Sequence, residues 1–424
     1  MTATDTYRTI DAVWRIEQAK LIAGIARLVG DVGVAEEVAQ DALVAALEQW
    51  PKSGIPDKPG AWLMATAKHR AIDWLRRRKL IQRKHEELGR ETEADEGASP
   101  DLDAALDDDI GDDLLRLIFT ACHPVLATEA RLALTLRLVG GLSSEEIARA
   151  FLVPEATVAQ RIVRAKRLLA EKRVPFEVPG GAELGQRLQS VLEVVYLIFN
   201  EGYSATAGDD WMRPQLCEEA QRLGRILAEL APNEPEVHGL VALMEIQASR
   251  LAARTGPSGE PILLLDQNRG RWDQLLIRRG LAALERAEMR AKEQERDLGP
   301  YALQAAIAAC HARARTADET DWARIMGLYG VLAELAPSPI VELNRAVALG
   351  MLSGPAAGLE RIDKLASAPA LKAYHLLPSV RGDFLSKLGR LEEARAEFER
   401  AASLTRNERE RKLLLERAAA CTRR

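Results

Sequence analysis

Basic side chains gather in two short segments of this sequence, although the whole chain carries a formal net charge of −5. Phosphate binding depends on local positive potential, so each segment is a candidate for contact with nucleic acid. A solvated charged face is the alternative for either segment taken alone. The first segment contains Lys68, His69, Arg70, Arg76, Arg77, Arg78, Lys79, Arg83 and Lys84. The second contains Arg161, Arg164, Lys166, Arg167, Lys172 and Arg173.

The sequence offers no comparable set of residues for catalysis. It contains no G-x-S-x-G motif, no P-loop, no dinucleotide-binding fingerprint and no cluster of His and carboxylate residues at ligand spacing. Cys122 and His123 are adjacent, but a zinc site would need two further ligands nearby. We therefore expect no enzymatic activity, no catalytic residue, no cofactor and no metal.

The sequence predicts a cytoplasmic protein. Its cysteines are too far apart for a zinc pattern and too few for a disulfide framework, so reduced thiols are expected at Cys122, Cys217, Cys310 and Cys421. No stretch reaches the roughly 18 uncharged apolar residues of a membrane span. The N-terminal residues lack the basic start and apolar run of a secretion signal.

The composition favours an all-α protein of several domains. Apolar residues make up 47% of the chain and aromatic residues only 4%, and the abundant Ala, Leu, Glu and Arg are helix formers. A chain of 424 residues is longer than one hydrophobic core usually organises. The predicted divisions are residues 1–85, an acidic linker at 86–113, a second helical domain at 114–173, and a large domain at 182–424.

The first predicted domain consists of helices on either side of a Pro- and Gly-rich break. Apolar residues recur at helical spacing through residues 8–85, and the break runs from Trp50 to Gly60. The helix from about Pro59 onward has one packed side and one basic side. Trp62 and Trp74 lie at core spacing on the packed side, with stacking on bases as the alternative.

A helix-turn-helix pattern occupies the second predicted domain. Ser143 and Glu146 form a capping box that starts one helix, and Leu152 to Pro154 supplies a short turn. A second helix is predicted from Thr157 to Leu169. Its inward positions are Val158, Ile162, Ala165 and Leu169. The positions left for its outer face are Thr157, Gln160, Arg161, Arg164 and Arg167.

The long C-terminal part predicts a stack of helical hairpins. The sequence LAELAP at 227–232 recurs at 332–337, and its prolines end each unit. Near the end of the chain, the spacing of a tetratricopeptide repeat is followed by Gly382, Leu385, Gly389, Ala394, Phe398 and Ala401. Two further segments, YLIFNEGYSAT at 196–206 and LLDQNRGRWDQ at 264–274, fit either a ligand pocket between repeats or helix capping and packing.

The ordered motifs resemble a known family. AEEVAQDALVAALEQW, the Pro/Gly loop and PGAWLMATAKHRAIDWLRRRK are similar to region 2 of bacterial sigma factors of the extracytoplasmic-function group. LSSEEIARAFLVPEATVAQRIVRAKRLLAEKR is similar to their region 4. The remainder resembles the long C-terminal extension of one subgroup, which carries tetratricopeptide-like repeats.

This resemblance implies roles for the first domain. The helix that matches residues 35–50 would dock on core RNA polymerase through Glu37, Gln40 and Asp41. The loop Lys52 to Lys58 would capture a base flipped from the downstream promoter box. The melting strand would be lined by Lys68, Arg70, Asp73, Arg76 and Arg77. The acidic linker would either mimic a strand in the RNA exit path or remain a solvated linker.

The resemblance also places the helix-turn-helix in the major groove of the upstream promoter box. Arg161 and Arg164 would read bases or anchor phosphates, and a bidentate arginine–guanine contact contributes about 1–3 kcal/mol of discrimination. Thr157 and Gln160 would lie near the groove floor. Ala159 departs from the family pattern, because many members carry a basic residue there.

We therefore expect a sigma factor that binds core RNA polymerase and promoter DNA, with C-terminal repeats that regulate its activity by binding a protein or a small ligand. One alternative is a helix-turn-helix regulator that does not engage polymerase. The polymerase-docking helix and the loop of the first domain argue against it. The other alternative is a repeat-type interaction scaffold, against which the intact basic faces argue.

Overall fold

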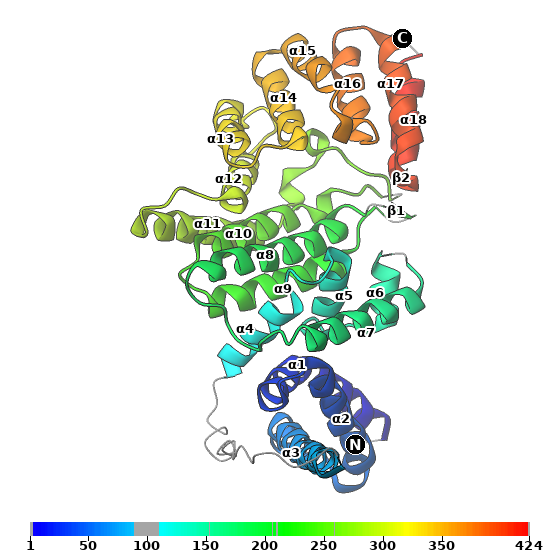
Figure 1. Ribbon diagram of the computed structural model, residues 1–424. Coiled ribbons are helices and arrows are strands. Elements are labelled where there is room, and N and C mark those ends of the chain that lie inside the picture. The colour runs from blue at the N-terminus through cyan, green and yellow to red at the C-terminus, as the bar shows by residue number, and fades with distance from the viewer. Residues whose placement is uncertain are drawn as a thin grey trace. The chain divides into compact units, whose positions relative to one another are not determined.

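The computed structural model describes residues 3–88, 110–151, 153–205, 207–208, 211–257 and 259–422. Throughout these residues the chain is all-α, as predicted, with one parallel pair of two-residue strands (Figure 1). The chain forms two compact units, residues 1–194 and 195–424. Most of the predicted acidic linker at 86–113 lies outside the described residues.

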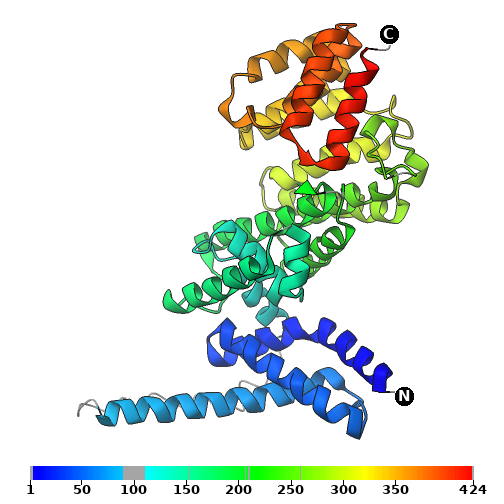
Figure 2. The ribbon, with the colours of Figure 1, turned by 90° about the vertical axis from the view of Figure 1, so that its right-hand side faces the viewer.

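The helices of the first unit surround small cores rich in alanine. Ile22, Ile25 and Leu63 are almost fully buried where α1, α2 and α3 meet, and the fully buried Ala39 and Ala42 let α2 lie close to its neighbours. Figure 2 shows α3 as one long helix (light blue). The bounds are α1 (Ala3–Val29), α2 (Val32–Ser53), α3 (Pro59–Leu88), α4 (Ile110–Ala121), α5 (Thr128–Leu138), α6 (Ser144–Phe151), α7 (Glu155–Glu171) and α8 (Gly181–Tyr203), which continues into the second unit.

The turns that frame α2 follow from individual residues. Gly30 has φ of +70°, which favours glycine, and the Asp31 carboxylate then caps α2 by accepting hydrogen bonds from Gly33 N at 2.7 Å and Val34 N at 3.1 Å. The predicted break from Trp50 to Gly60 is too long, because α2 continues to Ser53. Pro51 lies in the last turn of α2, where its missing N–H leaves the carbonyl of Leu47 without its intrahelical donor.

The second unit is built from helices that pack against their neighbours in sequence. Five of its described α-helices begin with a proline, a position where the missing N–H has no intrahelical partner. The bounds are α9 (Pro214–Leu230), α10 (Pro235–Ala248), α11 (Gln274–Glu293), α12 (Pro300–Arg313), α13 (Trp322–Leu335), α14 (Pro339–Ser353), α15 (Pro355–Leu365), α16 (Leu376–Lys387), α17 (Leu391–Leu404) and α18 (Glu408–Ala420). Short 3₁₀ turns lie at Leu251–Ala253, Leu264–Asp266, Arg269–Arg271 and Pro369–Leu371.

The internal echo and the repeat-like spacing correspond to helix hairpins. The two LAELAP segments end α9 and α13, and α10 and α14 follow them. The tetratricopeptide-like spacing falls on α16 and α17, which pack together. Gly382 is required there, because a Cβ would lie 2.9 Å from the fully buried Phe398 ring.

Two segments far apart in sequence close the second unit. Strand β1 (Ala207–Gly208) pairs in parallel with β2 (Arg406–Asn407), with Ala207 opposite Arg406 (Figure 1). The buried Asn407 side chain donates from Nδ2 to Ala205 O at 3.2 Å, and its Oδ1 caps α18. The end of the repeat stack is thereby fastened to its beginning.

Candidate nucleic-acid interface

The helix-turn-helix begins with the predicted capping box. Ser143 Oγ accepts a hydrogen bond from Glu146 N at 3.1 Å, and the Glu146 carboxylate accepts one from Ser143 N at 2.7 Å. The two bonds satisfy amides at the start of α6 that have no partner inside the helix. Pro154 directly precedes α7, whereas Leu152, the first residue of the predicted turn, lies outside the described residues.

Replacing Ser143 by alanine is expected to destabilise the start of α6 by about 1 kcal/mol, because the Glu146 amide loses its acceptor. Amide hydrogen exchange in the first turn of α6 should therefore accelerate about fivefold. Ser144→Ala is the matched control, since Ser144 does not take part in the capping box. Equal exchange rates in the two variants would contradict the prediction.

Helix α7 has the two faces that its spacing predicts. Its buried residues are Val158, Ile162, Ala165 and Leu169. On the other side Gln160, Arg164 and Arg167 are exposed, and Thr157 and Arg161 are half-buried. Val163 is also 64% exposed, although sequence reasoning did not single it out. An exposed valine beside outward arginines could contact a thymine methyl group.

The arginines of α7 differ in their availability. Arg167 forms an ion pair with Glu171 at 2.6 Å. Within the described part of the chain, the side chains of Arg161 and Arg164 have no ion-pair or hydrogen-bond partner. These two guanidinium groups are therefore free to bind phosphate oxygens or base edges.

The basic side of α3 is partly neutralised within the first unit. Arg76 and Arg77 are exposed, whereas Lys68 and Arg70 are half-buried. Arg70 lies 3.2 Å from the Asp41 carboxylate on α2, and Arg76 lies 3.8 Å from the Asp73 carboxylate. A DNA strand passing along this side would compete with those carboxylates for both arginines.

Two tryptophans close the loop between α2 and α3. The loop consists of residues 54–58, and Gly54 has φ of +88°. Trp50 is buried and meets the half-buried Trp62 ring edge-on at 5.4 Å, which fixes the spacing of the two helix ends. Trp74 is also half-buried, and the Arg78 guanidinium lies over its ring at 5.2 Å. Neither Trp62 nor Trp74 is fully enclosed in a core.

The outer face of α2 carries both acidic and apolar groups. Glu37 and Asp41 are exposed, and Gln40 is half-buried. Val44 is 49% exposed and Leu47 is 36% exposed one and two turns further along the same face. Sequence reasoning missed these two residues, although their helical spacing from Glu37 and Gln40 was visible. Exposed aliphatic groups beside carboxylates are suited to a protein interface with a basic rim.

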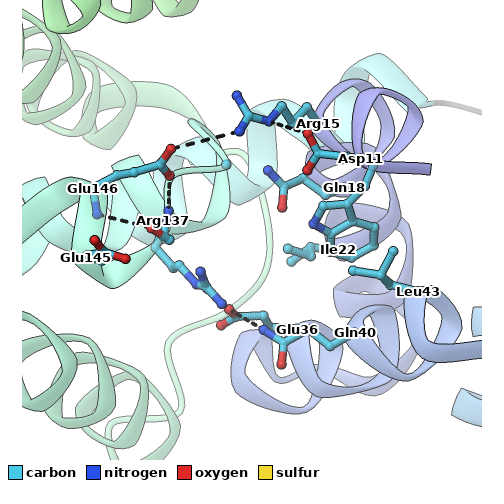
Figure 3. Close-up of a pocket in the computed structure, with 13 residues that line it drawn as sticks. Asp11, Arg15, Gln18, Ile22, Glu36, Gln40, Leu43, Arg137, Glu145 and Glu146 are labelled. Atoms are coloured by element: carbon cyan, nitrogen blue, oxygen red, sulfur yellow. Dashed lines mark hydrogen bonds and ion pairs between the residues drawn. The ribbon is translucent and has the colours of Figure 1, made fainter. Parts of the chain in front are cut away.

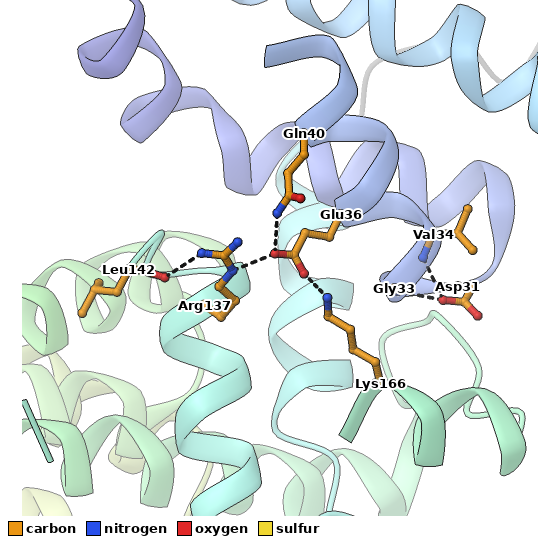
Figure 4. Close-up of polar contacts among 8 residues, drawn as sticks. All are labelled: Asp31, Gly33, Val34, Glu36, Gln40, Arg137, Leu142 and Lys166. Carbon is orange, nitrogen blue, oxygen red and sulfur yellow. Dashed lines mark hydrogen bonds and ion pairs between the residues drawn. The ribbon is translucent and has the colours of Figure 1, made fainter. Parts of the chain in front are cut away.

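The buried carboxylate of Glu36 joins α2 to the helix-turn-helix region (Figure 4). Glu36 is only 4% exposed, and its Oε1 accepts hydrogen bonds from Arg137 Nε at 2.7 Å and Gln40 Nε2 at 3.0 Å. Its Oε2 accepts a hydrogen bond from Lys166 Nζ on α7. Lys166, one of the basic residues of the second segment, is therefore engaged inside the unit.

A cavity of about 550 Å³ lies beside this carboxylate (Figure 3). Asp11 and Arg15 of α1 line it, with a 3.3 Å ion pair between them, and Arg15 also lies 4.0 Å from the Glu146 carboxylate. Arg137 on its wall binds Glu36. The wall carries the carboxylates of Asp11, Glu36, Glu145 and Glu146 and the guanidinium groups of Arg15 and Arg137, so negative charge exceeds positive charge there.

Cys122 and His123 have structural partners. Burial raises the pKa of Cys122 to about 11, and its Sγ lies 3.3 Å from Thr135 Oγ1. His123 Nδ1 accepts a hydrogen bond from Val125 N at 3.1 Å. The described residues contain no group of three or more His, Cys, Asp or Glu placed to hold a metal ion. Among them, too, no helix has the length and apolarity needed to cross a membrane.

Comparison with protein families identifies three matched segments. Residues 16–81 match sigma-70 region 2, and residues 116–169 match sigma-70 region 4. Residues 187–288 match DUF6596, a family of unknown function.

Two relatives and one solved structure are similar to the chain. The uncharacterized protein R00370 of Rhizobium meliloti is 42% identical over 400 residues, which cover 94% of this chain and 92% of that protein. The probable ECF RNA polymerase sigma factor SigI of Mycobacterium tuberculosis is 28% identical over 172 residues, 40% of this chain and 57% of SigI. The crystal structure of yeast Tom70 aligns over 99% of this chain and 86% of its own, with 13% identity and a TM-score of 0.36, too low to establish a common fold.

Proposed function

We propose that this chain, which belongs to the sigma-70 family of bacterial RNA polymerase sigma factors in the extracytoplasmic-function group, binds core RNA polymerase and directs transcription initiation from specific promoters. The observation that carries the proposal is the ordered pair of a region 2 match and a region 4 match, with two arginines outward on α7 for which the described residues supply no partner. An ordinary DNA-binding regulator has no use for the first of these regions.

Each of the two exposed basic faces would contact one of the two promoter boxes. The outer face of α7, with Thr157, Gln160, Arg161, Arg164 and Arg167, would enter the major groove of the upstream promoter box. The basic side of α3 and the loop at 54–58 would hold the melted strand of the downstream box. The DNA-facing residues proposed on α3 are Lys68, Arg70, Arg76 and Arg77.

Polymerase would dock on the outer face of α2. Glu37, Gln40 and Asp41 supply polar contacts there, and Val44 and Leu47 supply apolar area. The Asp41–Arg70 ion pair would have to open, because Asp41 would contact polymerase and Arg70 would contact DNA. Docking of polymerase would then free Arg70 for the DNA strand.

The regulatory role of the C-terminal part and the domain limits belong to this proposal. We retain limits of 1–85, 86–113, 114–173 and 182–424, a cytoplasmic location and the absence of enzymatic activity. The beginning of α8 nevertheless packs within the first unit: Arg187 Nη2 donates to Phe119 O at 3.1 Å, and Ser190 Oγ donates to Cys122 O at 2.6 Å. A shortened chain should therefore end at Val194 and not at Arg173.

Run-off transcription with purified core polymerase tests the proposal, with promoters taken from genomic fragments that the full chain binds. We expect the full chain to initiate transcription, and the chain ending at Val194 to differ in yield because the repeats are absent. The sign of that difference tells whether the extension activates or inhibits. DNA binding without polymerase binding or transcripts would replace this proposal by a plain DNA-binding regulator.

A further inference from the structure

Three arginines of the second unit lack a carboxylate partner among the residues that the structure describes. Arg250 donates to the amide oxygens of Gln267 at 3.2 Å and Gln247 at 3.3 Å. Arg269 donates to the carbonyl oxygens of His311 and Ala314 and to Thr320 Oγ1. Arg254 is 6% exposed, and its Nη1 has no partner. None of the three therefore forms an ion pair with a carboxylate of the described residues, although Glu319 is close enough to Arg269 to oppose part of the lowering of its pKa by burial.

Other arginines of the second unit do form ion pairs with carboxylates. Arg225 and Arg279 both bind the buried Glu245 carboxylate at 2.9 Å. The segment from Arg250 to Arg269 lies only a few residues further along the chain and follows the opposite pattern.

Aromatic rings hold the three guanidinium groups. The Arg254 guanidinium lies 3.6 Å from the Tyr203 ring centre and 5.2 Å from that of Trp211. Arg250 and Arg269 lie over the buried Trp272 ring at 5.4 and 5.0 Å. Stacking fixes the plane of a guanidinium group while its N–H edge stays available for an acceptor. We call Arg250, Arg254, Arg269, Tyr203, Trp211 and Trp272 the arginine–aromatic cluster.

The cluster also gathers buried donors without acceptors. Besides Arg254 Nη1, the part of the chain that the structure describes supplies no hydrogen-bond partner for Trp211 Nε1, Thr255 Oγ1 or Trp272 Nε1. Each buried donor left without an acceptor costs about 1–3 kcal/mol. Trp211 Nε1 lies in a ring beside the Arg254 guanidinium and Trp272 Nε1 in the ring beside Arg250 and Arg269, so both halves of the cluster favour an acceptor-rich partner.

The electrostatics of the cluster agree with this geometry. Burial lowers the pKa of Arg254 and of Arg269, and the neighbouring Arg250 lowers both further, whereas Tyr203 raises the pKa of Arg254 and Glu319 raises that of Arg269. Burial, followed by Arg250 and Arg269, lowers the pKa of His311 to about 4, so this histidine is neutral at pH 7. The cluster therefore exerts a positive potential on groups close to it, and it would favour an anion.

We propose that the arginine–aromatic cluster binds a small oxyanion, namely a carboxylate or phosphate group on a metabolite-sized ligand. An oxyanion supplies several acceptor lone pairs and negative charge together, which matches the unpartnered N–H and O–H groups. The enclosure of Arg254 and Trp272 favours a small group over a macromolecular surface.

This site gives the second unit a ligand-binding role beyond transcription initiation. All six residues of the cluster lie within residues 187–288, the segment that matches the family of unknown function. They include Tyr203 from the YLIFNEGYSAT segment and Arg269 and Trp272 from LLDQNRGRWDQ. The inference does not depend on polymerase or promoter binding, because it concerns the second unit alone.

The test measures thermal unfolding of the full chain in inorganic phosphate, in succinate, and in sodium chloride at matched ionic strength. We expect a saturable rise of about 3 °C in the melting temperature with phosphate or succinate beyond the chloride control. The larger of the two responses identifies the oxyanion as phosphate-like or carboxylate-like. Arg254→Met and Arg250→Gln should remove the rise. Arg271→Gln should keep it, because this exposed arginine of the same loop lies outside the cluster.

Equilibrium dialysis with radiolabelled phosphate or succinate provides a second measurement that does not rely on unfolding. If Arg254→Met does not fold, the dialysis compares Arg250→Gln with the unaltered chain, because Arg250 is only half-buried and its exchange should not prevent folding. Binding by the unaltered chain and by Arg271→Gln, with at least a tenfold loss in Arg250→Gln, supports the site. Absence of saturable binding of both probes, or equal binding by all variants, overturns it.

Discussion

Exchange of Arg161 and Arg164 for glutamate is expected to reduce promoter-directed transcription by at least about 100-fold. Both guanidinium groups face outward on α7 without a partner in the described part of the chain. Each specific arginine–base contact contributes about 1–3 kcal/mol, and glutamate adds repulsion from the phosphates. Run-off transcription measures the effect, and a gel-shift salt titration should show a shallower salt dependence of DNA binding.

A double charge reversal elsewhere separates this effect from net charge. Lys364→Glu with Lys412→Glu makes the same change on exposed side chains of the second unit, whose surface ion pairs contribute little. This control should keep most of the transcription. Binding to core polymerase should be unchanged in both variants, since α7 is not the proposed docking face. Full transcription by the Arg161/Arg164 variant would remove α7 from the promoter interface.

Replacing Glu36 by glutamine is expected to destabilise the first unit by about 2–3 kcal/mol. The substitution leaves Arg137 and Lys166 facing a neutral amide, and an amide cannot accept hydrogen bonds from all three present donors. Breaking a fully buried pair costs about 3–5 kcal/mol, and we expect less because both cations are partly exposed. Urea unfolding, followed by amide exchange in α2 and α7, measures the loss.

Glu37→Gln is the matched control for Glu36→Gln. It removes the same charge from the next residue of α2, but Glu37 is exposed. We expect its effect on stability to lie within about 0.5 kcal/mol, as is usual for surface substitutions. Equal stability of the two variants would show that the Glu36 contacts contribute nothing to the first unit.

The features that could be predicted from the sequence depend on short spacings. Val158, Ile162, Ala165 and Leu169 repeat at helical intervals, and they form the buried stripe of α7. The capping box needs only residues three apart, so Ser143 and Glu146 were sufficient to place the start of α6. Outward positions follow once the inward ones are known.

The features that could not be predicted depend on contacts between distant segments. Glu36 binds Arg137 and Lys166, which lie 101 and 130 residues further along the chain. The motif around Trp272 suggested a pocket only as one of two alternatives, because its relation to Arg250 arises from the folded loop. No spacing rule tells which of many charged residues will meet. The position of Glu36 in the buried stripe beside Ala35 and Ala39 was the one available signal.

The parallel pair of β1 and β2 restricts how this protein can change in evolution. An open stack of hairpins tolerates the gain or loss of a repeat, because each repeat contacts only its neighbours. Here Ala207 must meet Arg406 after all the intervening helices, and Asn407 must reach Ala205. An inserted or deleted hairpin would change the rise and rotation between those ends. We therefore expect relatives that keep this strand pair to have the same number of repeats and to vary in their loops.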